Sequence, residues 1–276
     1  MERAQPSFDR GYVDEPWATL VAECPGADVY PPADFRTEWG PIFHRGRLDG
    51  TARVLVIGQD PGTHEAIVRR ILVGEAGQRL QGFLARLGIT RSYVLINAFV
   101  YSVYGQHGGN RHRDDPVIAA YRNRWLDALA AGGRLEAVVA LGTLAEEAFA
   151  TWAATPAGAV SALACRRIRH PTYPEAASRG GAITKAEAMR EMLADWNAAL
   201  DQLRPAVANP DVTQPADRYG ATLTAEDLRA IPDADLPPGL PGWMRSLDAW
   251  ATRRGETADE KRATIVVRVP RAHRSW

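Results

Sequence analysis

The chain contains four short runs of apolar residues, and each run ends close to glycine or a polar residue. The runs at 53–57, 92–96 and 137–141 are rich in Val, Ile and Leu, while the run at 163–168 is weaker. Nearly continuous apolar runs of this length are typical of strands that are covered on both faces, as in a parallel sheet between helices. We therefore expect these runs to form four parallel strands.

The segments between and after the runs predict helices. Four stretches have the pattern of helices: 65–87, 116–131, 144–152 and 184–203. Thr184, followed three residues later by Glu187, predicts a capping box at the start of the last one. Alternating strands and helices favour an α/β fold, namely a three-layer α/β/α sandwich with a central four-stranded parallel sheet.

The segment after residue 204 has a different composition. It contains seven prolines between residues 205 and 241, a helix-like stretch at 243–252 and an apolar run at 264–269 that is typical of an edge strand. Its tryptophans favour packing against the rest of the chain. These are Trp243, Trp250 and Trp276. We predict a domain at 1–204 and a Pro-rich C-terminal extension at 205–276 that packs on the core and covers its surface.

Composition narrows the class of protein. The 276 residues include 46% apolar and 24% charged residues, which is typical of a folded globular chain. The 33 basic residues balance the 33 acidic ones, which argues against a general polyanion binder but leaves local basic patches open. No apolar segment resembles a secretory signal or a membrane span. We expect a cytoplasmic monomer without a membrane partner.

The cysteine count excludes several kinds of site. Cys24 and Cys165 are too few for a disulfide framework, a four-cysteine zinc site or an all-cysteine iron–sulfur cluster. The chain also lacks a P-loop, a zinc-protease HExxH motif and a GxSxG nucleophile elbow. We therefore expect no cofactor and no metal site.

Polar residues follow three of the predicted strands. Asp60 lies just beyond the first strand, Asn97 follows the second, and His170 lies just beyond the fourth. In an open α/β sheet the site lies at the carboxyl ends of the strands, so these side chains are expected to converge. Each alone has a structural interpretation, as a helix cap, a turn residue or a buried histidine. Together, on separate strands, they favour a functional site.

The residues around these positions resemble a known family. GQDPG at 58–62, INA at 96–98 and HPT at 170–172 are similar to the three motifs of the uracil-DNA glycosylase superfamily. Other segments resemble the iron–sulfur branch of that superfamily: LVGEAGQRL at 72–80, GNR at 109–111, NRWL at 123–126 and VVALGTLAEEAF at 138–149. The resemblance covers residues 20–203 in order and spacing. That branch needs four cysteines, so the chain resembles a cluster-free member whose catalytic domain spans 1–204.

The resemblance implies a DNA glycosylase that flips uracil out of DNA, hydrolyses its N-glycosidic bond and starts base excision repair. Asp60 matches the family's catalytic aspartate, which would activate a water below C1′ and favour the cationic sugar. His170 matches the histidine that hydrogen-bonds uracil O2, where negative charge develops. The implied partner is uracil-containing DNA.

The same resemblance implies a pocket for the base. Asn97 matches the asparagine that accepts from uracil N3–H and donates to O4, a pattern that cytosine reverses. The backbone of Gln59 would complete the contacts to the base edge. Gly58 and Gly62 would let the loop approach the nucleotide closely.

Two walls of this pocket depart from the family pattern. Leu72 stands where the family typically has a phenylalanine that stacks on uracil, so the ring is either missing or supplied elsewhere. The candidates for it are Phe99, Tyr101 and Tyr104. Gly62 stands where cluster-free enzymes place a tyrosine against the thymine methyl. We therefore expect a roomier pocket that accepts some modified bases besides uracil.

DNA contacts are expected from the loop after the last motif and from nearby arginines. Tyr173, with Thr172 before it, occupies the position of the family's intercalation loop, which wedges into the gap left by the flipped base. Packing within the loop is the alternative for Tyr173. The arginines expected to contact phosphates are Arg111, Arg113 and Arg169, with Arg166, Arg167 and Arg179 nearby.

Two alternative functions stay open. One branch of the superfamily forms a covalent adduct through a histidine on a basic loop, and His112 lies close to that place. Asp60 stands where that branch has glutamine, which favours hydrolysis over covalent trapping. The other alternative is a non-catalytic nucleic-acid-binding module on the same fold.

Overall fold

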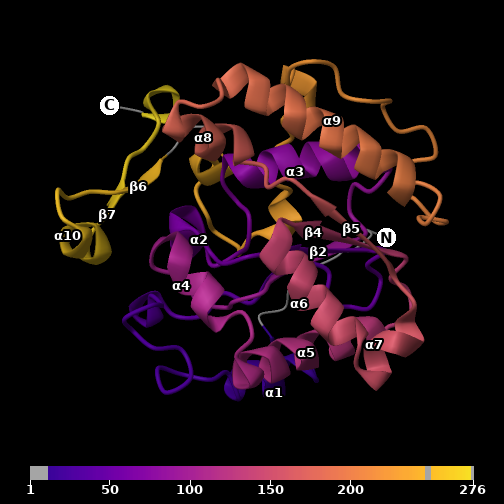
Figure 1. Ribbon diagram of the computed structural model, residues 1–276, viewed down its shortest axis with the longest axis horizontal. Helices are drawn as coiled ribbons and strands as arrows, with labels where there is room; N and C mark the ends of the chain where they lie inside the picture. Colours follow the sequence, from indigo (N-terminus) through magenta and orange to yellow (C-terminus); the bar gives the residue numbers. More distant parts are fainter. Residues whose placement is uncertain (1–11, 246–249, 275–276) are drawn as a thin grey trace.

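The central sheet has five strands in the order β1-β3-β2-β4-β5 (Figure 1). The computed structural model describes residues 12–245 and 250–274. The strands are β1 (His44–Gly46), β2 (Val54–Gly58), β3 (Tyr93–Asn97), β4 (Ala137–Leu141) and β5 (Ala164–Ile168). β2 pairs in parallel with β3 and β4, and β4 with β5. The four apolar runs therefore form parallel strands, as predicted.

β1 corrects the prediction of a four-stranded, purely parallel sheet. It runs antiparallel to β3, with His44 opposite Ile96. The strand is three residues long and two of them are polar, so neither length nor apolar pattern marked it. Both polar side chains are fully buried because they find partners. His44 Nδ1 lies 2.6 Å from the Tyr12 hydroxyl, and Arg45 lies 2.7 Å from the carboxylate of Asp235.

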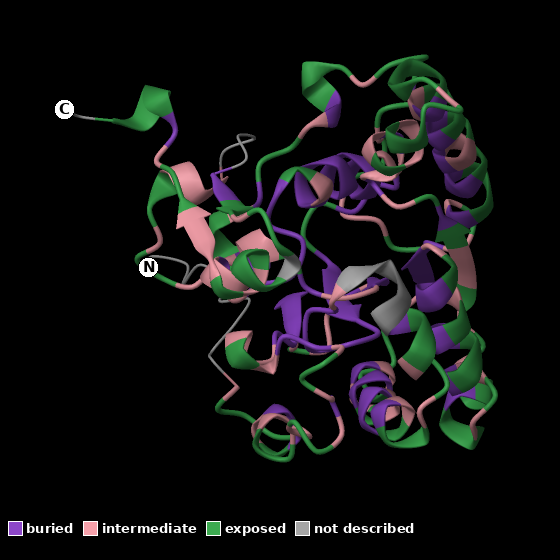
Figure 2. Cartoon of the chain, turned by 60° about the vertical axis from the view of Figure 1, so that its left-hand side comes forward, coloured by how far each residue is buried: buried purple, intermediate pink, exposed green. Residues whose placement is uncertain are grey.

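Helices cover both faces of the sheet, which confirms the three layers (Figures 1 and 2). Alternate residues of each strand point to opposite faces, so Leu55 and Ile57 join one apolar cluster while Val54 and Val56 join the other. One side is formed by α1 (Trp17–Ala22), α5 (Pro116–Ala131), α6 (Thr143–Ala153) and α7 (Pro156–Ser161). The other side is formed by α3 (Glu75–Arg86) and α9 (Lys185–Leu203).

Local signals set the ends of several helices. α5 has the predicted bounds because the Asp115 carboxylate accepts from the backbone N–H groups of Val117 and Ile118, at 2.9 and 3.1 Å. The capping box of α9 is confirmed: the Thr184 hydroxyl accepts from Glu187 N–H at 3.2 Å, and the Glu187 carboxylate accepts from Thr184 N–H at 2.9 Å. Three shorter helices follow the carboxyl ends of strands: α2 (Thr63–Val68), α4 (Gly105–His112) and α8 (Tyr173–Ala177).

The single helix predicted at 65–87 is wrong, because α2 and α3 are separated by a loop at 69–74. Arg69 and Leu72 adopt left-handed φ angles of 63° and 52° in this loop. Arg69 reaches out to the carbonyl oxygens of Trp39 and Pro41, at 2.6 and 2.5 Å. These partners lie about thirty residues away, so the helical pattern of the segment does not reveal the break.

Three aspartates of the C-terminal extension bind to the core. Asp211 accepts from the N–H groups of residues 90–92, at 2.8, 2.8 and 2.9 Å, and Asp227 pairs with Arg86. Asp235 is fully buried between Arg45 and the Tyr93 hydroxyl, which donates to it at 2.5 Å. These contacts join the three aspartates to β1, β3, α3 and the loop before β3, while the division of the chain at residue 204 stays a prediction.

The end of the extension forms a small hairpin of its own. β6 (Ala251–Arg253) pairs antiparallel with β7 (Ile265–Val267), and α10 (Ala258–Ala263) lies between them in sequence. The apolar run at 264–269 therefore forms a strand outside the central sheet. The helix predicted at 243–252 is replaced by a short turn ending at Arg245 and by β6, and residues 246–249 and Trp276 lie outside the described residues. Across the described ranges, no helix is long and apolar enough to cross a membrane.

Candidate functional site

Asp60 lies in the loop between β2 and α2. Its carboxylate accepts a hydrogen bond from the backbone N–H of Val103 at 2.9 Å, and the Gln59 side chain also bonds to it. Burial raises the pKa of Asp60 from 3.8 to about 6, against the opposing effect of these hydrogen bonds. A carboxylate that is held in place and has a pKa near 6 is a stronger base than an ordinary aspartate, which suits it to take a proton from water.

Asn97 is the last residue of β3 and pairs directly with Gly58 of β2. A Cβ atom at position 58 would lie 2.3 Å from Asn97 Oδ1, so glycine leaves the room that this amide needs. Asn97 is 5% exposed, and its Nδ2 makes no hydrogen bond with any residue that the structure describes. Burying an amide donor without a hydrogen-bond partner costs free energy. An unpaired buried donor is therefore expected where a ligand supplies the missing acceptor.

His170 follows β5, and hydrogen bonds with Thr172 determine which of its ring nitrogens carries the proton. Thr172 N–H donates to His170 Nδ1 at 3.2 Å, and the Thr172 hydroxyl lies 2.9 Å from the same nitrogen. Burial, together with the charge of Arg79, lowers the pKa of His170 to about 4. The ring is therefore neutral at pH 7. Because Nδ1 accepts, the proton lies on Nε2, which makes that nitrogen a hydrogen-bond donor.

Arg79 of α3 supports the loop that carries His170. Its guanidinium donates to the Pro171 carbonyl at 2.6 Å and to the two oxygens of Glu175 at 3.0 and 2.9 Å. Arg79 is 4% exposed, so the hydrogen bonds that hold this loop come from a buried cation. Sequence reasoning missed this role, because Arg79 lies 92 residues from Pro171 and only the fold brings them together.

Asp60, Asn97 and His170 lie at or just beyond the carboxyl ends of β2, β3 and β5. β2 and β3 are neighbours, and β5 lies two strands from β2 on the other side. Since neighbouring strands are about 4.8 Å apart, the loops of Asp60 and His170 start roughly 10 Å from each other. A carboxylate, an amide donor and a neutral imidazole donor at this spacing could together bind and hydrolyse a polar ring compound.

A second buried carboxyl group lies close to Asp60. Glu65 of α2 accepts from Val73 N–H at 3.3 Å, and burial raises the pKa of Glu65. Its charge contributes to the raised pKa of Asp60. Gly62 is exposed at the start of α2, and a Cβ atom there would lie 2.7 Å from Glu65 Oε2. Glu65 was missed because a single acidic residue at a helix start is ordinary.

The predicted wall residues lie in apolar packing beside these loops. The N–H of Phe99 donates to the Gln59 carbonyl at 2.9 Å, but the ring is fully buried, 5.4 Å from that of Phe35. Leu72 is 8% exposed in its left-handed conformation. The Tyr101 hydroxyl donates to the Pro25 carbonyl at 3.2 Å. Which of these side chains contacts a base stays a prediction.

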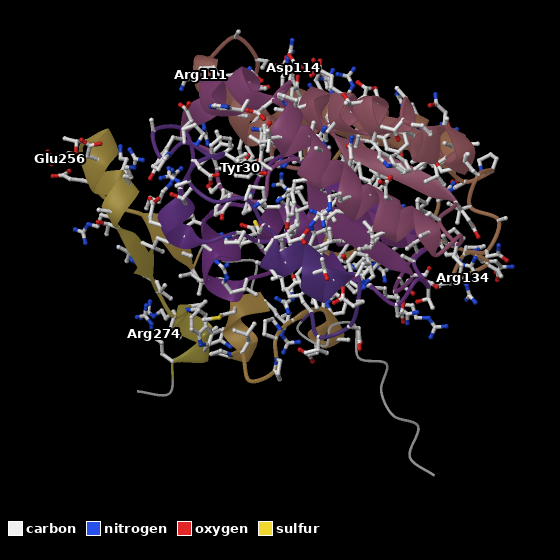
Figure 3. The ribbon with its side chains drawn as sticks, turned by 90° about the horizontal axis from the view of Figure 1, so that it is seen from below. Tyr30, Arg111, Asp114, Arg134, Glu256 and Arg274 are labelled. Carbon is white, nitrogen blue, oxygen red and sulfur yellow. The ribbon has the colours of Figure 1, made fainter. Side chains whose placement is uncertain are left out.

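The residues predicted at the end of α4 already have acidic partners. Arg111 pairs with Asp34, and His112 Nε2 lies 2.8 Å from the same carboxylate. Arg113 pairs with Asp114 at 3.0 Å. Figure 3 shows the side chains of Arg111 and Asp114 at the surface of one end of the molecule. Asp34, which sequence reasoning did not consider, thus holds two of the predicted residues together.

Arg169, Thr172 and Tyr173 lie with His170. The guanidinium of Arg169 lies 4.4 Å from the centre of the Tyr173 ring, and the Tyr173 hydroxyl donates to Glu191 at 2.7 Å. A cavity of about 360 Å³ is lined by Arg169, His170 and Tyr173, among others. These contacts hold Tyr173 in place, and its role as a wedge in DNA stays a prediction.

The two cysteines do not fit the iron–sulfur cluster of the branch that the sequence resembles. Cys24 and Cys165 are half-buried free thiols, and burial raises the pKa of both, that of Cys165 to about 12. Two thiols are half of the four that such a cluster needs. In the described part of the chain, no group of three or more His, Cys, Asp or Glu residues could hold a metal ion.

A protein-family model matches the chain. The model of the Uracil DNA glycosylase superfamily aligns with residues 45–197, which is more than half of the 276 residues and runs from β1 into α9. The chain belongs to the uracil-DNA glycosylase superfamily. Members of this superfamily are typically hydrolases that remove uracil or damaged bases from DNA by cleaving the N-glycosidic bond. No curated protein sequence matches the chain.

Proposed function

We propose that this protein is a uracil-DNA glycosylase that hydrolyses the N-glycosidic bond of a flipped-out uracil and so starts base excision repair. The observation that carries the proposal is the position of three side chains at the carboxyl ends of strands, within the span that the family model matches: Asp60, Asn97 and His170. The products would be free uracil and an abasic site in the DNA.

In this proposal Asp60 activates the attacking water. The C1′–N1 bond breaks and its electron pair leaves with the base, while the water oxygen bonds to C1′ and its proton passes to Asp60. With a pKa of about 6, the carboxylate is mostly ionised at pH 7.5 and remains a useful base. Its negative charge also favours the positive charge that develops on the sugar.

His170 would stabilise the leaving base. Negative charge develops on uracil as the bond breaks, and much of it lies on O2. A neutral imidazole with its proton on Nε2 can donate a hydrogen bond to that oxygen and remain neutral. The lowered pKa of His170, about 4, supports this role, because the ring stays in the donor form over the whole neutral range.

Asn97 would select uracil. Its Oδ1 would accept from N3–H, and its Nδ2, which has no partner among the described residues, would donate to O4. Cytosine presents the opposite pattern at this edge, so the amide would leave one donor and one acceptor unpaired. Because Gly62 presents no side chain, we expect the pocket to accept 5-substituted uracils, xanthine or hypoxanthine as well.

The test is excision of uracil from a labelled oligonucleotide, followed by alkali to cut the abasic sites. We expect cleavage by the wild-type protein and a loss of about 10²–10⁴-fold for Asp60→Ala, the range that a general base contributes. The matched control is Asp49→Ala, which removes an exposed carboxylate and should leave the rate unchanged. An Asp60→Ala rate close to that of the wild type would overturn the proposed mechanism.

The same assay separates the alternatives. Intact DNA that is retarded on a native gel would indicate a binding module without catalysis. A protein–DNA band that survives boiling would indicate a covalent adduct, and its loss in His112→Ala would place that adduct on His112. Excision of uracil with none of the other bases would disprove the roomier pocket.

A further inference from the structure

Two arginines from distant parts of the chain stack on Tyr104. The guanidinium carbon of Arg36 lies 3.9 Å from the centre of the tyrosine ring, and that of Arg262 in α10 lies 3.8 Å from it. Two guanidinium groups cannot share one face of a ring at these distances, so they lie on opposite faces. The stack joins the C-terminal extension to the loop that follows β3.

Arg36 is buried, and two of its three guanidinium nitrogens lack a hydrogen-bond partner among the residues that the structure describes. It is 3% exposed, and its Nε and Nη1 make no hydrogen bond within the described ranges. Its backbone N–H donates to the Ser102 carbonyl at 2.8 Å, next to Val103, whose N–H holds Asp60. The positive charge of Arg36 also lowers the pKa of Asp60.

A third arginine adds to this positive charge. Arg253 of β6 is exposed, and β6 lies against α2, where the N–H of Ala251 donates to His64 Nε2 at 3.4 Å. The positive charge of Arg253 also lowers the pKa of Arg36, after the larger effect of burial. Glu38 accepts from the Tyr104 hydroxyl at 2.5 Å. Two of these three guanidinium groups come from the extension. A group of guanidinium groups with unused donors favours an anion as ligand.

We propose that Arg36, Arg253 and Arg262 bind a backbone phosphate of the DNA strand whose nucleotide enters the Asp60 site, so that the C-terminal extension is part of the DNA-binding surface. A phosphate offers acceptor oxygens for Nε and Nη1 of Arg36 and neutralises the repulsion between the arginines. Figure 1 shows β6 and α10 on the same side of the molecule as α2 and α4, and β6 packs against α2. This proposal rests on DNA as the substrate of the proposed function.

The test compares single arginine variants in DNA binding as a function of salt concentration. Arg253→Gln is expected to weaken binding of a uracil-containing duplex about fivefold at moderate salt and to reduce the slope of log K against log salt by about one unit. Arg134→Gln is the matched control, because Arg134 is also exposed and lies at the opposite end of the molecule from Glu256, which precedes α10 (Figure 3). It should change neither value.

Two further measurements show whether the effect is local. Arg36→Lys keeps the positive charge but loses the planar donors, so it should also weaken binding. Its urea unfolding curve is measured alongside, because the change also removes the buried stack on Tyr104 and should lower the stability. In excision assays Arg253→Gln should raise KM for the uracil-containing duplex about as much as it weakens binding, and Arg134→Gln should leave both KM and kcat at their wild-type values. An equal salt slope for Arg253→Gln and Arg134→Gln would overturn the phosphate site.

This outcome is distinguishable from failure of the proposed function. If the wild-type protein binds DNA with the predicted salt slopes but releases no uracil, the phosphate site stands and the glycosylase activity does not. If it excises uracil and Arg253→Gln leaves the salt slope unchanged, the reverse holds. Absence of any DNA binding by the wild type would overturn both.

Discussion

Replacing Asp60 with asparagine is expected to stabilise the protein at pH 8 while it removes catalysis. Burial raises the pKa of Asp60 from 3.8 to about 6, so the folded protein disfavours the ionised form. Between these two values the native state binds more protons at this site than the unfolded chain does. Raising the pH from 4 to 8 therefore lowers the stability of the wild type relative to a variant that cannot ionise.

The size of the effect follows from the pKa. The rise is about two units, and one unit corresponds to about 1.4 kcal/mol, so ionisation of Asp60 costs about 3 kcal/mol of folding free energy. The cost is about 0.5 kcal/mol at pH 4, grows between pH 4 and pH 6, and is nearly complete at about pH 7. Asparagine has a similar shape, and its Oδ1 can still accept from Val103 N–H. The variant should therefore gain most of this amount at pH 8.

Urea unfolding of both proteins from pH 4 to pH 8, followed by tryptophan fluorescence, measures this difference. We expect the two free energies of unfolding to agree within about 0.5 kcal/mol at pH 4 and to diverge by about 3 kcal/mol at pH 8. Asp49→Asn, which changes an exposed carboxyl, should show no such divergence. A difference that is constant with pH, or a wild type that is the more stable protein at pH 8, would refute the reasoning.

Three further predictions concern packing and helix ends. Gly58→Ala places a Cβ atom 2.3 Å from Asn97 Oδ1, and the displaced amide should slow single-turnover excision by about 10²-fold. Asp235→Ala leaves Arg45 buried without its carboxylate, so urea unfolding should show a loss of about 3–5 kcal/mol. Thr184→Ala removes the cap of α9 and should cost about 1 kcal/mol in the same measurement.

A matched variant for each substitution separates its specific effect from a general loss of stability or activity. Gly180→Ala adds a methyl group where no atom lies within 4 Å and should leave excision unchanged. Asp233→Ala removes a largely exposed carboxylate that pairs with Arg245, and should cost less than about 1 kcal/mol. Thr184→Ser keeps a capping hydroxyl and should unfold like the wild type. An Asp235→Ala protein no less stable than Asp233→Ala would contradict the assigned role of the buried pair.

Local patterns were enough to predict much of the fold. Strands that are buried on both faces have nearly continuous apolar runs, and the four runs in this chain became β2 to β5. α5 has the predicted bounds, because its cap Asp115 and the proline after it are neighbours in sequence. The positions of Asp60, Asn97 and His170 at strand ends could be predicted for the same reason, since each lies within two residues of a strand.

Other features depend on residues that are far apart in sequence. β1 is polar and short, and its Arg45 is buried only because Asp235, 190 residues away, supplies a carboxylate. The break between α2 and α3 depends on carbonyl groups of the loop before β1. The stack on Tyr104 joins Arg36 to Arg262. Periodicity describes which face of an element is buried, and it carries no information on which distant side chain comes to lie against it.

The sequence by itself determined which side chains lie at the carboxyl ends of the strands, because strand ends and motif residues are local features. Only the tertiary structure decided the state of those groups. Asp60 has a pKa of about 6 because the fold buries it, and His170 is a neutral donor because Thr172, Arg79 and burial make it so. Protonation depends on solvent exposure and on neighbouring charges, and both are set by the packing of the whole chain.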